Sequence, residues 1–194
     1  RGFIYNTFLV SLITVLLATS YKQIGRLIFL FSLLTLIAIL KGFWQKFIGF
    51  DAIEYDALME SGMYKTHLLP QITRYFSIFT DAGNYGSNMG FTCVLFGITG
   101  LFSKKPGLKT YYLCVSALSL YSMFTTGTRG AIVVPLGGLL LFALISKNIR
   151  LMSAATVGGI CIYVFFAFTY AGESNYMIRR MRTAFRPNKD ASYL

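Results

Sequence analysis

Arg129 is the residue of this sequence best suited to bind an anion. It lies in the stretch TTGTRGAIVV, where two apolar segments meet, with Gly127 and Gly130 close by. An arginine near lipid is costly without an anionic partner, and its planar guanidinium fits the oxygen atoms of a phosphate. The glycines would let a ligand approach the backbone. We therefore predict an anion clamp at Arg129. The alternative is a side chain that only reaches the lipid–water interface.

A second group of basic residues lies near the end of the sequence, in the stretch IRRMRTAFRPNK. If residues 174–185 are helical, Arg179, Arg182 and Arg186 fall at positions i, i+3 and i+7 and share one face. Pro187 would then end the helix. These three arginines could add positive charge to the same site. A solvated helix, or one bound to anionic lipid heads, would have the same pattern.

Arg74 is the third candidate, because it precedes a segment rich in Gly, Asn and Asp that leads into an apolar stretch. We predict a turn over residues 81–88, which could place Asn84 and backbone amides near a ligand. Asp81 and Asn84 are the residues expected to support the site. Ordinary turn chemistry would explain the same composition without a ligand.

The remaining ionisable residues indicate neither a metal site nor a cofactor. His67 is the single histidine, so no zinc motif is possible, and it has no visible partner as a general base. Four acids precede it, at Asp51, Glu54, Asp56 and Glu60. Their spacing fits no calcium loop. We interpret them as the solvated face of an amphipathic helix that rests on the membrane through Phe43, Trp44, Phe47 and Ile48.

The composition shows what must position these residues. Of 194 residues, 55% are hydrophobic and only 13% are charged, against about 45–50% and about 25% in soluble domains. The mean hydropathy is +0.60. Much of the surface must therefore face a lipid bilayer. The net charge of +11 could suggest nucleic acid, but lysines and arginines at the ends of spans explain it better, and we expect no nucleic-acid partner.

We predict an all-α fold, a polytopic membrane helix bundle in one transmembrane domain over residues 1–194. The apolar runs are continuous and do not alternate, which favours helices over barrel strands. Six transmembrane helices are expected, over residues 3–20, 25–41, 87–103, 110–127, 130–146 and 151–170. Pro135 falls in the first turns of the fifth span, where a helix tolerates proline best.

The charges of the short connections orient these spans. The connections 21–26, 104–109 and 147–150 contain lysine or arginine and no acid, which predicts that they are cytoplasmic. An outer loop over 42–86, the turn at 127–130 and the segment 171–194 then lie on the opposite face. All the candidate arginines lie on the side that the charge rule disfavours, so they call for a specific role.

Residues 70–194 resemble the bacterial O-antigen ligase/polymerase family. The resemblance rests on three stretches in order: RYFSIFTDAGNYGSNMG at 74–90, GTRGAIVVPL at 127–136 and RMRTAFRPNKDAS at 180–192. It implies a membrane core like that of GT-C glycosyltransferases, in the bacterial inner membrane with its active face in the periplasm. The activity implied is transfer of a glycan from undecaprenyl diphosphate to lipid A–core, or to a growing polysaccharide chain, without a cofactor.

The same resemblance implies roles for the arginines. Arg129 matches the junction arginine of the family and Arg74 the arginine before the turn, while Arg179, Arg182 and Arg186 correspond to arginines of the tail. Together they would stabilise the negative charge that develops on the diphosphate leaving group.

One feature of the family has no counterpart. Its catalytic histidine lies late in a large periplasmic loop, and His67 is not at a matching position. We therefore expect a piece of a longer protein, without the catalytic base, in which 171–194 begins that loop. Two alternatives stay open: a transporter or flippase of a lipid-linked saccharide, which would predict ionisable residues in mid-span, and a non-catalytic membrane subunit.

Overall fold

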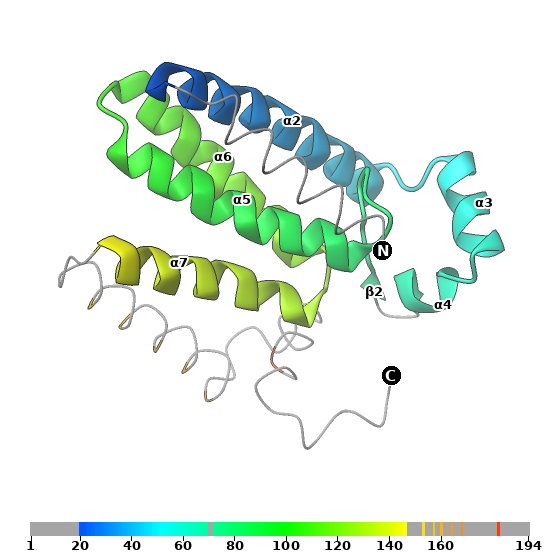
Figure 1. The fold of residues 1–194 in the computed structure, drawn as a ribbon. Helices are drawn as coiled ribbons and strands as arrows, with labels where there is room; N and C mark the ends of the chain where they lie inside the picture. The colour runs from blue at the N-terminus through cyan, green and yellow to red at the C-terminus, as the bar shows by residue number, and fades with distance from the viewer. Residues whose placement is uncertain are drawn as a thin grey trace. The chain divides into compact units, whose positions relative to one another are not determined.

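The structure is a computed structural model that describes residues 20–69 and 72–146, together with six single residues: Ser153, Val157, Ile160, Val164, Phe168 and Arg182. The chain divides into two compact units, Arg1–Leu34 and Thr35–Leu194. Helix α2 begins in the first unit and ends in the second (Figure 1). The candidate site lies wholly in the second unit.

Helices make up most of the described chain. They are α2 (Tyr21–Phe47), α3 (Ala52–Glu60), α4 (Tyr64–His67), α5 (Ala82–Phe102), α6 (Pro106–Thr125), the 3-10 helix η1 (Arg129–Ile132) and α7 (Val133–Ser146). Two strands of two residues each, β1 (Leu68–Leu69) and β2 (Ile72–Thr73), pair antiparallel between α4 and α5. The predicted helical fold class is confirmed for these residues.

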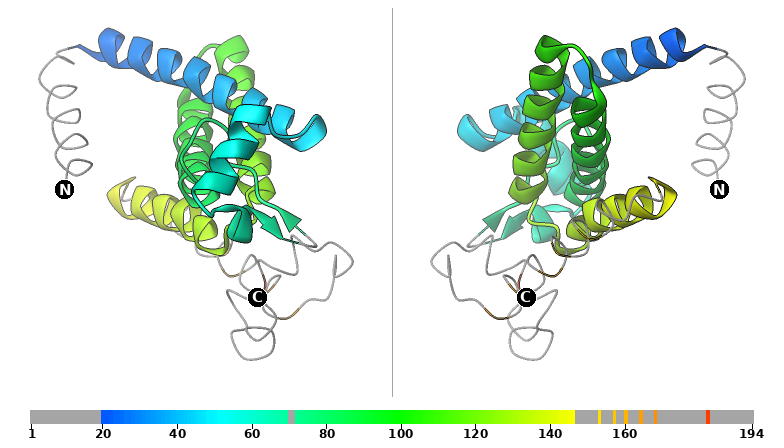
Figure 2. Two further views of the ribbon diagram at one scale, coloured as in Figure 1. Left: turned by 90° about the vertical axis from the view of Figure 1, so that its right-hand side faces the viewer. Right: turned by 90° about the vertical axis from the view of Figure 1, so that its left-hand side faces the viewer.

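Helices α5 and α6 form an antiparallel pair that lies side by side in every view (Figures 1 and 2). Near the connecting end, a Cβ on Gly100 would come within 3.0 Å of Leu113, so the two backbones approach closely there. Further along, the Ser116 hydroxyl donates to the Cys93 carbonyl at 2.7 Å. Pro106 opens α6, where the missing N–H costs nothing.

The second half of α2 has one buried face and one exposed face. Ala38 and Ile39 are buried in the core together with Tyr85, Met89, Met123, Ala131 and Ile132. The exposed residues Ile37, Leu40, Trp44 and Phe47 recur every three or four positions, which places them on one face. Such an apolar exposed face is what a helix in contact with lipid presents.

Within the described residues, two helical stretches are long and apolar enough to cross a membrane, Tyr21–Phe47 and Arg129–Ser146. They contain the predicted spans 25–41 and 130–146, and Pro135 lies in the first turn of α7 as expected. The predicted spans 87–103 and 110–127 overlap helices α5 and α6, which begin five and four residues earlier; these two segments are confirmed as helices but are not among the stretches apolar enough to cross a membrane. The span 3–20 lies outside the described residues except for Ser20, and so does 151–170 except for five single helical residues.

The prediction of one amphipathic helix over the aromatic and acidic residues is wrong. Phe43, Trp44 and Phe47 belong to the last turns of α2, whereas the acids lie at the start of and along α3. Gly49, with φ of +115°, separates the two helices. Asp51 is the N-cap of α3, and its N–H donates to the Glu54 carboxylate at 3.0 Å. Two of the four acids therefore build a helix start and are not simply a solvated face.

Candidate functional site

The site lies at the end of the α5–α6 pair where α5 begins and α6 ends. Arg74, which follows β2, is fixed there by all three of its guanidinium nitrogens. Its Nε donates to the Thr126 carbonyl at 3.2 Å, and its Nη2 to the Thr128 hydroxyl at 3.0 Å. Its Nη1 donates to the Thr66 carbonyl at 3.4 Å. One arginine thus joins the loop before α5 to the turn after α6, more than fifty positions later.

Two further charges lie close to Arg74. Burial lowers the pKa of the Arg74 guanidinium from its usual value, the Asp81 carboxylate opposes that shift, and the positive charge of Arg129 adds to it. The charges of the two arginines therefore interact, although the residues are far apart in the sequence. Thr128, the residue before Arg129, is 54 positions from Arg74 and accepts a hydrogen bond from it. Asp81 is the carboxylate that partly balances Arg74.

Arg129 is the first residue of η1 and is half-buried. Within the described ranges, its guanidinium has no hydrogen bond and no ion pair. The turn before it is ordered by the Thr128 N–H, which donates to the Thr126 hydroxyl at 3.2 Å. Arg129 is thus placed by an ordered backbone while its charged group stays available, which is the arrangement expected for a residue that binds an anion.

The two glycines beside Arg129 have different roles. No described atom lies within 4 Å of a Cβ built on Gly130, so the space there is open, as predicted. Gly127 adopts a φ of +61°, a conformation that residues with side chains rarely take. Gly127 is therefore needed to turn the chain from α6 into η1.

The predicted turn over 81–88 is wrong, because this segment forms the first two turns of α5. Asp81 is the N-cap, and its side chain accepts from the N–H groups of Gly83 and Asn84. The glycines of this segment serve packing: a Cβ on Gly86 would lie 2.7 Å from the Thr126 hydroxyl and 3.0 Å from Ala131. Glycine favours turns and close helix contacts equally, and the sequence alone did not distinguish them.

The supporting residues have defined contacts. Asn84 is exposed, and its side-chain amide donates to the Thr80 hydroxyl at 2.9 Å. Asp81 combines the cap of α5 with its charge interaction with Arg74. Asp81 is therefore part of the site in both structure and electrostatics, while Asn84 stabilises the entry into α5.

His67 has a structural role. It is 3% exposed, and its Nε2 accepts the Ala82 N–H at 3.3 Å. Its Nδ1 lies 3.1 Å from the Met63 carbonyl, so we assign the ring proton to Nδ1. Burial lowers the pKa of His67, and the nearby Arg74 lowers it further. Both ring nitrogens of this neutral histidine are engaged, so His67 is not a free general base.

The tail arginines are only partly described. Arg179 and Arg186 lie outside the described residues. Arg182 is helical and 4% exposed. The alternative of a solvated helix is therefore wrong at Arg182, and a role for it near an anion stays a prediction.

Sequence reasoning missed the threonines that hold Arg74. Thr66, Thr126 and Thr128 contribute two carbonyls and a hydroxyl, and the Thr128 hydroxyl in turn donates to the Ala82 carbonyl at 3.0 Å. The density of threonines in TTGTRG was the available signal, but it does not identify the arginine that they bind.

The chemistry that this arrangement suits is the binding of a multivalent anion. The guanidinium of Arg74 is fixed on Thr128, the residue before Arg129, and the guanidinium of Arg129 is available, with one carboxylate that is already used as a helix cap. Across the part of the chain that the structure describes, no three His, Cys, Asp or Glu side chains are grouped to hold a metal ion. Comparison with protein-family models, curated proteins and solved structures finds no match.

Proposed function

We propose that this chain is the membrane core of a glycan ligase or polymerase that uses a lipid-linked donor. The reaction transfers a glycan from undecaprenyl diphosphate to lipid A–core, or to a growing polysaccharide chain, on the periplasmic face of the bacterial inner membrane. The observation that supports it best is the hydrogen bond from Arg74 to Thr128, which fixes Arg74 beside the residue that precedes Arg129 at one end of the α5–α6 pair.

The chemistry of this transfer needs fixed positive charge. The acceptor hydroxyl attacks the first sugar of the donor, the bond from that sugar to the diphosphate breaks, and the diphosphate leaves with an additional negative charge. Fixed donors lower the energy of such a leaving group more than mobile ones, because they need no reorganisation during the reaction. Arg74, held at three nitrogens, is of this fixed kind.

The surroundings suit a lipid carrier as well as a phosphate. Arg129 opens the apolar stretch Arg129–Ser146, which is long enough to cross a membrane. Several leucines and an isoleucine of α7 are exposed, at Leu139, Leu140, Leu141, Leu144 and Ile145. An anionic head at Arg129 with a polyprenyl chain along α7 would match both chemistries. A free sugar phosphate would leave the apolar face unused.

The finer parts of this proposal follow from the resemblance described above. Residues 1–194 would contribute six spans to a membrane core like that of GT-C glycosyltransferases, and Arg179, Arg182 and Arg186 would add charge around the diphosphate. The proton of the acceptor hydroxyl requires a base. His67, with both nitrogens engaged, does not supply it.

The test is replacement of Arg129 by Ala, and separately by Lys, in the full-length protein, with glycan attached to lipid A as the readout. We expect Arg129→Ala to lower transfer by about 100-fold or more, the scale of losing one charge-stabilising group. Arg129→Lys keeps the charge and should retain part of the activity. Double replacement of Lys104 and Lys105 by Ala is the control. Unchanged transfer in both Arg129 variants would contradict the proposal.

A further inference from the structure

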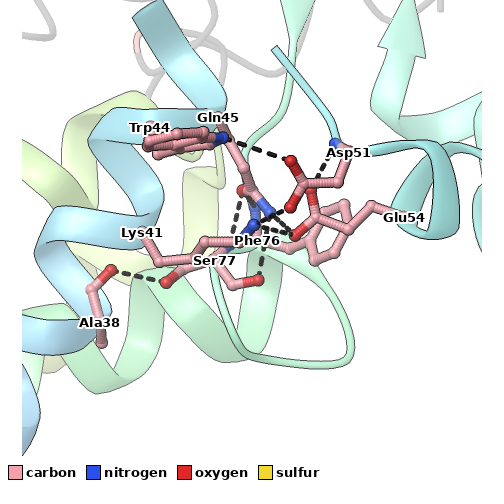
Figure 3. A network of polar contacts seen from close by, with 8 residues as sticks. All are labelled: Ala38, Lys41, Trp44, Gln45, Asp51, Glu54, Phe76 and Ser77. Carbon is pink, nitrogen blue, oxygen red and sulfur yellow. Dashed lines mark hydrogen bonds and ion pairs between the residues drawn. The ribbon is translucent and has the colours of Figure 1, made fainter. Parts of the chain in front are cut away.

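Gln45, on the buried face of α2, uses the full hydrogen-bonding capacity of its side chain (Figure 3). Its Oε1 accepts from the N–H groups of Ser77, at 2.7 Å, and Phe76, at 3.2 Å. Its Nε2 donates to the Ser77 carbonyl at 3.1 Å and to the Glu54 carboxylate at 2.9 Å. A primary amide has two acceptor sites and two donor hydrogens, so none is left over. Gln45 is 1% exposed, and no water can substitute for these bonds without rearrangement.

The segment that Gln45 binds is strained. Ser77 has a φ of +55°, which residues other than glycine rarely adopt. Its hydroxyl donates to the Ala38 carbonyl at 2.5 Å, about two turns before Gln45 on α2. Strained backbone persists only where its surroundings leave no alternative. The contacts from Gln45 and Ala38 supply that constraint.

This strained turn begins at Ser77, three positions after Arg74. On the other side, the Arg74 N–H donates to the His67 carbonyl at 2.8 Å and extends the β1–β2 hairpin by one bond. Phe76 packs in parallel on Phe50, with ring centroids 5.3 Å apart. The backbone of Arg74 is thus held before by the hairpin and after by Gln45.

Charged neighbours determine which way the Gln45 amide points (Figure 3). The Glu54 carboxylate accepts from Nε2 and also pairs with Lys41 at 3.0 Å. Lys41 pairs in addition with Asp51. A carboxylate held in place by a lysine favours the amide orientation that directs Nε2 to Glu54 and Oε1 to the two backbone N–H groups.

We propose that Gln45 is a positioning residue of the anion site. It acts through Phe76 and Ser77 to set where the Arg74 guanidinium lies, and this inference rests on the proposed function. Gln45 itself does not touch the ligand. Its loss should weaken binding of a diphosphate only to the extent that Arg74 contributes to that binding.

The experiment is a double-mutant cycle on the full-length protein in phosphatidylcholine nanodiscs titrated with undecaprenyl diphosphate. Gln45→Glu keeps the size but replaces the donor group by an acceptor that faces Glu54 and the Ser77 carbonyl. We expect it to raise the Kd about tenfold, the scale of misplacing one charge-assisted bond. In a background with Arg74→Ala it should cause no further loss, since the residue that it positions is gone.

A second variant tests whether the loss of affinity comes from general misfolding. Glu54→Gln added to Gln45→Glu restores a donor between the two side chains and should recover part of the affinity. Should Gln45→Glu not fold, Ser77→Ala, which removes only the bond to Ala38, takes its place in the cycle. The expectation is the same: a loss of affinity when Arg74 is present, and no further loss when Arg74 is replaced by Ala.

The outcomes separate the two proposals. An equal loss with and without Arg74, or no loss from the Gln45 and Ser77 variants while Arg74→Ala weakens binding, overturns the positioning role alone. Binding that is unchanged by Arg74→Ala overturns the proposed diphosphate site and the positioning role with it.

Discussion

The two ends of the α5–α6 pair are both basic, yet they are built differently. At one end Arg74 donates from three nitrogens to the backbone and a hydroxyl of three threonines, and lies near Arg129. At the other end Lys104 and Lys105 are exposed in the connection before α6. Within the described residues these lysine side chains have no hydrogen bond or ion pair. We call the end that contains Arg74 and Arg129 the organised end, because the charge of Arg74 is held there by directed hydrogen bonds. At the other end the charges of Lys104 and Lys105 are exposed.

This difference indicates two uses of positive charge. If the connection is cytoplasmic, as the sequence predicts, exposed lysines on flexible stems are enough to retain it there, because that role depends on charge alone. A guanidinium held at three nitrogens has lost its conformational freedom before any ligand arrives, so binding costs less entropy. The organised end is the one expected to recognise a ligand.

We expect the largest effect on glycan transfer when arginine and lysine are exchanged at the two ends of the pair. Arg74→Lys keeps the charge but cannot form three directed bonds to Thr66, Thr126 and Thr128, and should lower glycan transfer by about 10- to 100-fold, the scale of losing one to two hydrogen bonds to a charged group. Lys105→Arg should leave transfer unchanged. Transfer is followed as glycan attached to lipid A. Equal activity in the two variants would remove the distinction between the ends.

Close packing at the organised end predicts the next largest effect. Gly86→Ala would place a Cβ 2.7 Å from the Thr126 hydroxyl and 3.0 Å from Ala131, and overpacking of this kind costs about 1–3 kcal/mol. Gly137→Ala in α7 is the matched control, because no described atom lies within 4 Å of that Cβ. Melting temperatures in detergent should fall for Gly86→Ala only. A similar melting temperature for both variants would show that Gly86 is not in tight contact.

Two substitutions of Asp81 separate its role as the N-cap of α5 from the effect of its negative charge on Arg74. Asp81→Asn keeps an oxygen that can accept from Gly83 and Asn84, whereas Asp81→Ala loses the cap at a cost of about 1 kcal/mol. Asp81→Asn also removes the carboxylate that opposes the positive charge around Arg74, so it should tighten binding of undecaprenyl diphosphate. Melting curves and titrations of the two variants provide the check. Weaker binding with Asn would mean that the carboxylate helps to hold Arg74 in place.

A smaller effect concerns pH. Because the pKa of folded His67 lies below its usual value of 6.5, the unfolded chain takes up this proton first as pH falls. The stability that His67 contributes is complete above about pH 6.5 and declines below it, by at most about 1.4 kcal/mol per pH unit. His67→Gln, which does not titrate, should melt with a weaker dependence on pH between 7.5 and 5.5. An identical dependence in both proteins would contradict the assignment of a neutral, buried histidine.

The sequence predicted the helices well and the contacts between them poorly. The continuous apolar runs, with Pro135 near the start of the last one, were sufficient to predict most of α5, α6 and α7, but the first turns of α5 and of α6 were missed. The acids were misplaced because the break at Gly49 falls inside a run of aromatic residues, where composition does not reveal a backbone conformation.

For the candidate site too, the sequence identified residues but not the contacts between them. Arg74 and Arg129 were singled out by residue type and by resemblance, and the structure brings them near each other; that they bind a diphosphate stays a prediction. Gln45 carried no signal at all, because its partners Phe76 and Ser77 lie about thirty positions away. A side-chain amide whose donors and acceptors are all used can be recognised only in the folded structure.

The most direct test of the organised end as an anion site is a binding comparison on the full-length protein in nanodiscs. Undecaprenyl diphosphate is titrated into the wild type, the double variant Arg74→Ala with Arg129→Ala, and the double variant Lys104→Ala with Lys105→Ala. Losing two charge-assisted contacts predicts a Kd about 100-fold higher or more for the arginine pair. The lysine pair should bind like the wild type. Equal affinity in all three proteins, or an equal loss in both variants, would contradict the account.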